Sequence, residues 1–439
     1  MKKRVLAAAM AVTMAVSMLA GCSGNSTSSG SSKASGNSQT SAGSQTSNGD
    51  NQITVWGWDK NFNGYAMSEA AKLDSEVKVN FVEMSKADCL KKIHTVLASN
   101  VKEDLPDVVF ISDLNAQGYL MSYPGAFREM SDVLNYDNFA SYKISASSYQ
   151  GKKYGLPFDT GVAGLFYRTD YLSQIGYTKE KMQNLTWDEY LSLGAKLKAK
   201  GHMLQTFNPN DISQFQILLQ SAGTWFTDKS GNANFTNNKA LQEAYSIFKK
   251  LHSSNYCKVV SDWTGFAGAI NSGDVACVMR GSWISSTILQ GKDQSGKWAV
   301  APIPKMSVSG ATQYSNQGGS SMFVLKNSKH SDLAAKFLAK TFGSSTELYN
   351  TLLENKNIIG TFLPAEKVAA YDKGQDFYGG LKVNKTLAEW LKKIPAVETG
   401  AYSTEAQAAL ISVTPQYLAG GDLNKCLTEA ESQFKRAVQ

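Results

Sequence analysis

The amino terminus constrains this chain most, because it decides which part of the 439 residues can fold together. Lys2, Lys3 and Arg4 precede an apolar, alanine-rich run over residues 5–20. A membrane-spanning helix needs ~20 strongly apolar residues, and this run is shorter and poorer in large side chains. A charged start, a short apolar run and small residues at its end are typical of a secretory signal. We therefore expect residues 1–21 to be a signal peptide.

The end of this signal refines the prediction. Leu19-Ala20-Gly21-Cys22 resembles a bacterial lipobox, in which the cysteine is lipidated and becomes the first residue; an ordinary signal peptide with a chance cysteine is the alternative. Residues 23–50 consist almost wholly of Ser, Gly, Asn, Thr and Gln, which cannot bury enough apolar surface to fold. We expect residues 22–50 to be a lipidated cysteine and a disordered linker spanning about 30 Å. The protein would then be anchored to the cell membrane, facing outside.

Composition and charge exclude several classes of protein. The formal net charge is +7, and loss of the signal peptide lowers it by three, which gives no reason to expect nucleic-acid binding. Residues 51–439 are too many for one typical core, so two lobes are expected. Cys89, Cys257, Cys277 and Cys426 allow three disulfide pairings, and the sequence does not choose among them or exclude four free thiols.

Hydrophobic patterns predict an α/β fold. Apolar or alternating runs predict strands at residues 53–56, 77–82, 106–111, 162–167, 275–279 and 320–325, with an extended segment at 298–304. Helical spacing predicts helices at residues 65–73, 87–99, 187–199, 238–253, 266–271 and 332–342, and helical structure from 382 onward. Thr186 and Glu189 form a capping box at one helix start. The early strand–helix–strand–helix–strand order favours a mainly parallel sheet.

Catalytic patterns are scarce. No nucleophile elbow, phosphate-binding loop or dinucleotide fingerprint is present, and the four histidines are scattered. Gly318-Gly319-Ser320-Ser321 lacks the lysine and the spacing of a phosphate-binding loop. Asp59 and Asp113 both follow predicted strands and are the best available pair of carboxylates for a glycosidase. Acidic side chains at strand ends are at least as often ligand acceptors, so we expect no enzyme, no cofactor and no metal site.

Aromatic residues with polar neighbours stand out in the predicted loops. Trp58, Trp225, Trp263 and Trp283 each lie beside charged or polar residues, among them Arg280. A sugar ring has an apolar C–H face that can stack on an aromatic ring. Its hydroxyls need hydrogen-bond partners, of which charged ones are strongest. This pattern predicts a carbohydrate site, although each tryptophan could instead fill a core or hinge.

Several short motifs, in order, resemble the extracellular solute-binding proteins of ABC sugar importers, the group that includes maltose-binding protein. The resemblance covers nearly all of residues 52–439. Its markers are Val55-Trp56 with Asp59-Lys60 and Asn63-Gly64, Leu-Pro-Asp-Val-Val-Phe at 105–110, Tyr-Gly-Leu-Pro at 154–157, Leu-Phe-Tyr-Arg-Thr-Asp-Tyr-Leu at 165–172, Leu-Thr-Trp-Asp-Glu-Tyr at 185–190, Asn-Ser-Gly-Asp-Val-Ala at 271–276, Gly-Ser-Trp at 281–283 and Pro-Ile-Pro at 302–304.

The resemblance implies a two-lobed periplasmic-binding-protein type II fold, each lobe a mainly parallel sheet flanked by helices, with a hinge between lobes. We expect residues 51–160 and 312–362 in lobe 1, and residues 161–311 and 363–439 in lobe 2. The chain would cross near residues 159–162, 304–315 and 361–364. Ligand would bind between the lobes, which close on it. The closed form would dock on the transmembrane subunits of an ABC permease, and the protein is expected to be a monomer.

The resemblance also implies site residues. Asp59 and Lys60 match residues that bind sugar hydroxyls, Asp113 matches a polar ligand position, and Trp283 matches a stacking tryptophan. Glu83 follows the second strand where the family often has a carboxylate. Asp159 is the candidate to replace an acidic residue that the pattern otherwise lacks, and Arg168 stands where an asparagine is usual. Trp58, Trp225, Trp263 and Arg280 are predicted from their local chemistry.

Three functions remain open at this point. The first is a lipid-anchored protein that captures a carbohydrate, an oligosaccharide by the number of tryptophans, for an ABC importer. The second is a binding protein of the same fold for a polyamine, an anion or a peptide. The third is an exported glycoside hydrolase, which would need two suitably spaced carboxylates. The loop tryptophans favour the first.

Overall fold

The computed structural model describes residues 51–99 and 105–439. The predictions for the signal peptide, Cys22 and the linker lie outside these residues. The described residues belong to one compact unit, residues 48–439. None of the helices described is both long enough and apolar enough to cross a membrane.

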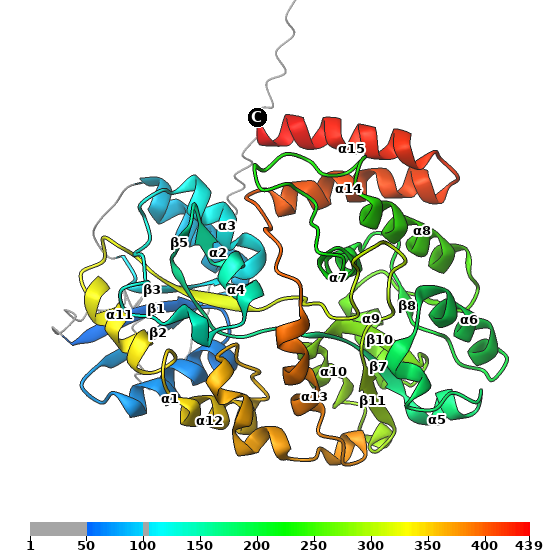
Figure 1. The fold of residues 1–439 in the computed structure, drawn as a ribbon, viewed down its shortest axis with the longest axis horizontal. Coiled ribbons are helices and arrows are strands. Elements are labelled where there is room, and N and C mark those ends of the chain that lie inside the picture. The colour runs from blue at the N-terminus through cyan, green and yellow to red at the C-terminus, as the bar shows by residue number, and fades with distance from the viewer. Residues whose placement is uncertain (1–50, 100–104) are drawn as a thin grey trace, which may run out of the picture. The chain divides into compact units, whose positions relative to one another are not determined.

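The first sheet has the strand order β2-β1-β3-β12-β6, and Figure 1 labels its neighbouring strands β2, β1 and β3. Its strands are β1 (Gln52–Gly57), β2 (Lys78–Glu83), β3 (Val108–Ser112), β6 (Gly155–Pro157) and β12 (Ser320–Val324). Val108 and Phe110 face a core with α1 (Tyr65–Leu73), α11 (Ser331–Lys340) and α12 (Thr346–Lys356). Val109 and Ile111 face the opposite core with α2 (Lys86–Ser99) and α3 (Asp113–Ser122). Alternation along a fully buried strand thus gives three layers, named here the first lobe.

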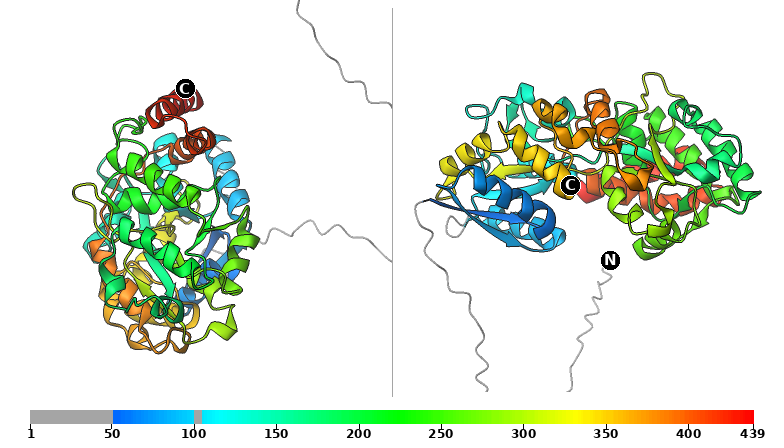
Figure 2. Two further views of the ribbon diagram at one scale, coloured as in Figure 1. Left: turned by 90° about the vertical axis from the view of Figure 1, so that its right-hand side faces the viewer. Right: turned by 90° about the horizontal axis from the view of Figure 1, so that it is seen from below.

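The second sheet is built around β7 (Ala163–Arg168), which lies between β10 (Cys277–Gly281) and β11 (Trp298–Ala301). One face packs on α6 (Trp187–Lys198), α7 (Ser213–Ser221), α8 (Lys239–Ser253), α14 (Ser403–Leu418) and α15 (Leu423–Val438). The other packs on α9 (Trp263–Asn271), α10 (Ser285–Ile288) and α13 (Val383–Trp390). Figure 2 shows α14 and α15 side by side along this assembly, named here the second lobe.

The prediction of mainly parallel sheets needs correction. In the first sheet β2, β1 and β3 are parallel, but β12 is antiparallel to both β3 and β6. In the second sheet β7 is antiparallel to β10 and β11. Parallel pairing in the described second lobe is confined to β8 (Thr206–Phe207) with β9 (Lys258–Val259), and to the bridges of Met203 with Val275 and of Thr186 with Lys305.

The connections explain these directions. Neighbouring parallel strands are normally joined by one crossover helix. β7 and β10 are instead joined by residues 169–276, which contain several helices, and β12 enters the first sheet from β11 of the second. Neither connection imposes a parallel direction. The α/β class is therefore confirmed, with mixed sheets in place of parallel ones.

Three hinge segments, residues 158–162, 302–319 and 357–362, run between the two lobes. They are joined to one another by backbone hydrogen bonds: Thr160 N donates to Ile359 O over 3.1 Å and Thr361 N to Phe158 O over 3.1 Å. Ala163 N donates to Ser315 O over 2.9 Å and Gln317 N to Gly161 O over 2.8 Å. The three segments therefore form one hydrogen-bonded crossing between the lobes, while the lobe bounds given above stay a prediction.

The cysteines of the described chain, Cys89, Cys257, Cys277 and Cys426, are free thiols and are buried. Burial raises the pKa of Cys89 and Cys257 to about 11 and that of Cys277 to about 12. Thiols of this kind are unreactive. They act as small apolar groups of the cores.

The closest approach in the hinge predicts the effect of one methyl group. A Cβ added to Gly161 would lie 2.0 Å from Gln317 O. We expect Gly161→Ala to lower the free energy of unfolding by about 1–3 kcal/mol, since the backbone must move to admit the group. Thermal and urea unfolding measure this. Gly268→Ala is the control: it lies within α9 with no atom within 4 Å of the new Cβ, and should leave stability unchanged or slightly raised. Equal stability of Gly161→Ala and the wild type would contradict the packing described.

Candidate functional site

A cavity of about 750 Å³ lies between the two lobes, against the hinge segments. Its size is within the roughly 300–1,000 Å³ typical of small-molecule sites. The first lobe lines it with Trp58, Phe62 and Lys86, and the second with Trp263 and Trp283 among others. The site is therefore assembled from parts of the chain that are far apart in sequence.

An aromatic platform forms the wall on the second lobe. Its members are Trp263, Phe266 and Trp283. The rings of Trp263 and Phe266 stack with centroids 5.1 Å apart, and those of Trp263 and Trp283 lie 6.0 Å apart. Trp263 is 54% exposed and Trp283 41%, although large aromatic side chains are normally buried. Exposed rings gathered in a cavity offer a surface on which an apolar face can stack.

Polar contacts hold this platform in place. Asp262 caps α9, accepting a hydrogen bond from Gly265 N over 2.8 Å, and so fixes the turn that carries Trp263. Trp283 Nε1 donates to Gln317 O over 2.8 Å, and Gly281 N donates to Gln317 Oε1 over 3.3 Å. Gln317 belongs to the second hinge segment. The platform is thereby attached directly to the hinge.

Arg280 and Asp211 form a charged pair beside the platform. Arg280 is the buried, next-to-last residue of β10, and its Nη2 lies 3.1 Å from Asp211 Oδ2. The guanidinium lies over the ring of Phe266 at 5.0 Å. Burial lowers the pKa of Arg280, while Asp211 opposes that change. Both residues line the cavity, where they present N–H donors and carboxylate acceptors side by side.

The wall on the first lobe combines aromatic and amino groups. Trp58 packs edge-on against Phe110, with ring centroids 6.2 Å apart. Lys86 Nζ lies 5.6 Å from the centre of the Trp58 ring. Phe62 packs against Phe158 of the first hinge segment, at 6.1 Å between centroids. This wall faces the ligand space with a second, smaller aromatic surface.

Two aspartates lie at the floor of the cavity, next to the hinge. Asp113 is the first residue of α3, and Asp159 belongs to the first hinge segment. Burial raises the pKa of both carboxyls, and the nearby Lys143 ammonium opposes this shift. Lys143 itself is fully buried and paired with Asp113.

The structure brings most of the predicted site residues together. The cavity is lined by Trp58, Asp113, Asp159, Trp225, Trp263, Arg280 and Trp283. Trp225 is 6% exposed, and its Nε1 donates to Ser403 Oγ over 2.8 Å. Its indole therefore closes one end of the cavity and offers little stacking surface.

Asp59, Lys60 and Glu83 are not among the residues that line the cavity. Asp59 Oδ1 accepts hydrogen bonds from Asn61 N over 2.8 Å and Phe62 N over 3.1 Å. It therefore caps the short π-helix η1 (Lys60–Gly64). Lys60 N donates to Glu83 Oε1 over 2.9 Å. Their role in the structure is to shape the turn that carries Phe62 toward the cavity.

Several lining residues escaped the sequence analysis: Phe62, Lys86, Phe207, Asn208, Asp211, Phe266, Asn316 and Gln317. Asp211 and Gln317 lie in loops rich in polar residues, and that pattern could have marked them as candidate binding residues. Lys143 carried no signal, because a lysine in a helical pattern normally indicates a solvated face. Its burial follows from neighbours that are distant in sequence.

The arrangement is suited to holding a ligand with apolar faces and a polar rim. Asp113 has both carboxylate oxygens engaged, by Ser321 Oγ at 3.0 Å and by Lys143 Nζ. Across residues 51–99 and 105–439, no three His, Cys, Asp or Glu side chains are grouped so as to bind a metal ion. The chemistry of the cavity is stacking and hydrogen bonding.

Comparison with known proteins agrees with this geometry. A family model described as bacterial extracellular solute-binding protein matches residues 65–377. A lactose-binding protein of Rhizobium radiobacter is 39% identical over 393 residues, covering 88% of this chain and 93% of that protein. An arabinooligosaccharide-binding protein of Bacillus subtilis (strain 168) is 25% identical, covering 78% and 77%. The solved structure of the sugar-binding protein MalE from Xanthomonas citri has a TM-score of 0.72 at 16% identity, covering 88% of this chain and 98% of that one.

The similarity to MalE identifies the fold, and the family model spans most of the residues from β1 to α13. The relatives named are binding proteins rather than enzymes. With its two α/β lobes, hinge and interlobe cavity, the chain belongs to the family of bacterial extracellular solute-binding proteins.

Proposed function

We propose that this protein captures a carbohydrate, a short oligosaccharide, in the interlobe cavity and delivers it to an ABC importer without changing it chemically. The observation that carries the proposal is the platform of Trp263, Phe266 and Trp283, whose two indoles are exposed and whose phenyl ring lies 5.0 Å from the guanidinium of the Arg280–Asp211 pair. Sugar rings need such a combination of apolar face and paired donors and acceptors.

Lactose is the first ligand to consider. The relative named as a lactose-binding protein is 39% identical over most of both chains. A disaccharide has two rings, and the cavity has an aromatic surface on each lobe, the platform on one side and Trp58 with Phe62 on the other. Arg280 Nη2 and Asp211 Oδ2 lie 3.1 Å apart. The guanidinium would donate to one sugar hydroxyl, and the carboxylate would accept from the neighbouring hydroxyl.

Binding is coupled to lobe closure through the hinge. Trp283 and Gly281 of the second lobe are hydrogen bonded to Gln317. Asp113 and Asp159 at the floor accept hydrogen bonds from residues 321 and 320, which follow it in the chain. A ligand that contacts both lobes favours the closed arrangement by the difference in its affinity for the two states. The closed form is the one we expect to dock on permease subunits, as a monomer.

The amino-terminal region completes the proposal. We infer that Cys22 is lipidated and that the Ser/Gly-rich residues after it form a leash at the outer face of the cell membrane. A tethered binding protein remains near its importer. This inference rests on the sequence of residues 1–50.

A non-sugar solute is the second candidate, because four aspartates line the cavity. A polyamine would need them free. Asp211 is paired with Arg280 and Asp113 with Lys143, so two of the four are already neutralised. A glycoside hydrolase is disfavoured further, since Asp59 caps a turn outside the cavity.

The proposed function predicts stabilisation by a carbohydrate. The purified protein should be screened by thermal melting and tryptophan fluorescence against lactose, arabino-oligosaccharides, maltodextrins, spermidine and inorganic phosphate. A ligand at a hundred times its Kd adds about 2.7 kcal/mol to the free energy of unfolding. We expect a sugar, lactose first, to raise Tm and shift the emission, and to be recovered intact by chromatography. A response to spermidine or phosphate alone, or cleavage of the sugar, would reject the proposal.

The platform predicts a graded effect of substitution. Trp283→Ala should weaken binding of the sugar by about 1–2 kcal/mol, five- to thirtyfold, because the stacking surface is lost. Trp283→Phe keeps an aromatic face and should weaken it less. Titration calorimetry measures both variants. Equal Kd values for Trp283→Ala and the wild type would show that this ring does not contact the ligand.

The anchor predicts a change of location. In the native bacterium, Cys22→Ser should abolish incorporation of labelled fatty acid and move the protein from the membrane fraction to the surroundings of the cell. Sugar affinity of the released protein should be unchanged, since the cavity is formed by later residues. Retention of label by the variant would exclude Cys22 as the lipidated residue.

A further inference from the structure

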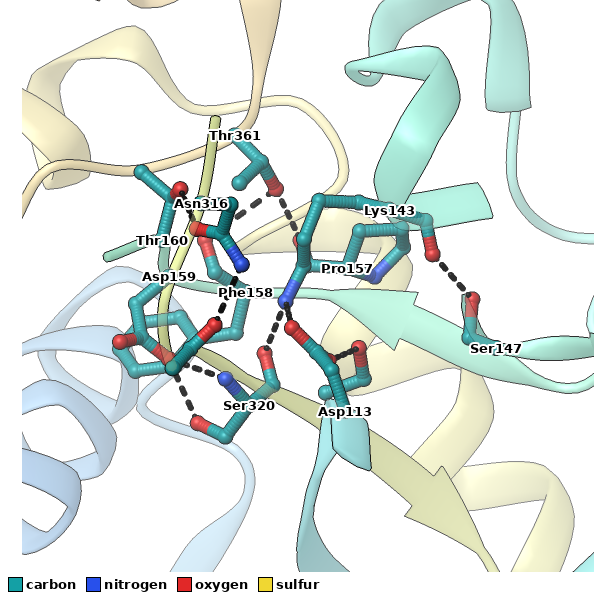
Figure 3. Close-up of polar contacts among 12 residues, drawn as sticks. Asp113, Lys143, Ser147, Pro157, Phe158, Asp159, Thr160, Asn316, Ser320 and Thr361 are labelled. Atoms are coloured by element: carbon teal, nitrogen blue, oxygen red, sulfur yellow. Dashed lines mark hydrogen bonds and ion pairs between the residues drawn. The ribbon is translucent and has the colours of Figure 1, made fainter. Parts of the chain in front are cut away.

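A fully buried lysine lies beneath the cavity floor. Lys143 belongs to α4 (Ser141–Ala146) and is 0% exposed. Its Nζ donates to Asp113 Oδ2 and, over 3.0 Å, to the backbone oxygen of Ser320 (Figure 3). An ion in the interior is costly unless it is paired and hydrogen bonded. Such a residue is not needed for packing, which an apolar side chain would serve at lower cost.

The segment at residues 318–321, formed by two glycines and the first two residues of β12, connects this lysine to the second aspartate. Ser320 N and Oγ donate to Asp159 Oδ1 over 2.8 and 2.6 Å. Ser321 Oγ donates to Asp113 Oδ1 over 3.0 Å. This segment lacks the lysine and the spacing of a phosphate-binding loop. It donates hydrogen bonds to both carboxylates, and its Ser320 carbonyl accepts one from Lys143.

Gly319 allows the groups to come this close. Its φ of +97° is in the left-handed region, where glycine is favoured. A Cβ there would lie 2.8 Å from Asp113 Oδ2 and 3.2 Å from Lys143 Nζ. The Gly319 backbone therefore lies against the Asp113–Lys143 pair, in a conformation and at a distance that a residue with a side chain would not permit.

One carboxylate oxygen remains for a ligand. Both oxygens of Asp113 and Oδ1 of Asp159 are engaged, whereas no residue of the described chain donates to Asp159 Oδ2. Asp159 lines the cavity. Its Oδ2 is therefore the acceptor that the floor offers to a ligand hydroxyl.

We propose that Lys143 is a positioning residue for ligand capture: through Asp113 and Ser320 it holds the segment that presents Asp159 Oδ2 to the cavity as a hydrogen-bond acceptor. This rests on the proposed carbohydrate function and adds the device that prepares its floor. Lys143 does not itself touch the ligand. It acts through the two aspartates.

The charges around this cluster determine how it responds to pH. Asp113 and Asp159 face Lys143 from α4 and Lys86 from α2, together with the neutral phenols of Tyr142 and Tyr349. Burial raises the pKa of both carboxyls, and Lys143 lowers it. Acceptor strength is present above these pKa values and is lost as pH falls through them. Without Lys143 the pKa values rise further, so the loss begins at higher pH.

The test compares Lys143→Met with Lys152→Met, the same change at an exposed lysine of β5 (Lys152–Lys153) outside the cavity. Kd for lactose is measured by calorimetry from pH 5 to 8, or for the tightest sugar of the panel if lactose does not bind. We expect Lys143→Met to bind roughly tenfold more weakly at pH 7, the equivalent of one hydrogen bond to a charged group. Its affinity should also decline at a higher pH than that of the wild type. Lys152→Met should match the wild type in both respects.

A second pair of variants applies if Lys143→Met does not fold. Asp113→Asn and Asp113→Asn/Lys143→Met differ only by the lysine, and the double variant buries no unpaired ammonium. The proposal expects weaker binding and a higher pH midpoint in the double variant. A folded variant lacking Lys143 that keeps the affinity and pH profile of its parent would overturn the inference alone. A wild type that binds none of the sugars would overturn the proposed function and the inference with it.

Discussion

The crossing of the three hinge segments is the constraint on which the rest of the structure depends. The chain passes there between the lobes as extended backbone, and polar side chains such as Thr160, Asn316 and Thr361 are buried in these segments. Buried polar groups must be hydrogen bonded. Asn316 Oδ1 accepts from Thr160 Oγ1 over 2.9 Å and from Gly161 N over 3.0 Å, and Thr361 Oγ1 donates to Pro157 O over 2.9 Å (Figure 3). Directional bonds at the hinge, together with the apolar core in which Tyr142 and Leu353 pack with Phe166 of the second sheet, define the relative orientation of the lobes.

The cavity inherits its organisation from this crossing. Its floor is part of the hinge, and its aromatic wall is tied to the hinge through Gln317. The platform and the floor are therefore hydrogen bonded to the same short segment, residues 317–320. This gives a physical route by which binding and closure favour one another, without a separate coupling element.

Charge pairing leaves the cavity with little net charge. Arg280 and Lys143 carry positive charge into buried positions, and each is matched by an aspartate from another element. The pairs leave directional donors and acceptors on the surface of the cavity with little net charge. Hydroxyl groups suit such a surface because each can donate and accept.

The local elements could be read from the sequence because they follow from periodicity. The buried strand at Val108–Ser112, the capping box at Thr186 and the helix at Lys239–Ser253 match the patterns that predicted them. Trp263 and Trp283 were also recognisable as site candidates from their polar neighbours, whereas the same pattern at Trp225 belongs to a buried indole. The motifs of the family indicated the two-lobed α/β fold for the same reason: they lie within local turns and strand ends.

The tertiary structure alone decided the directions of the strands and the composition of the cavity floor. Strand direction depends on the long connection between β7 and β10, and Asp59, Lys60 and Glu83 were assigned to a turn by hydrogen bonds within it. Lys143 donates hydrogen bonds to Asp113, 30 residues away, and to the backbone oxygen of Ser320, 177 residues away. The sequence determined which segments are helices, strands and aromatic loops, because hydrophobic pattern and turn chemistry are local. Which charges are buried and which acceptor remains free depends on segments brought together only by folding.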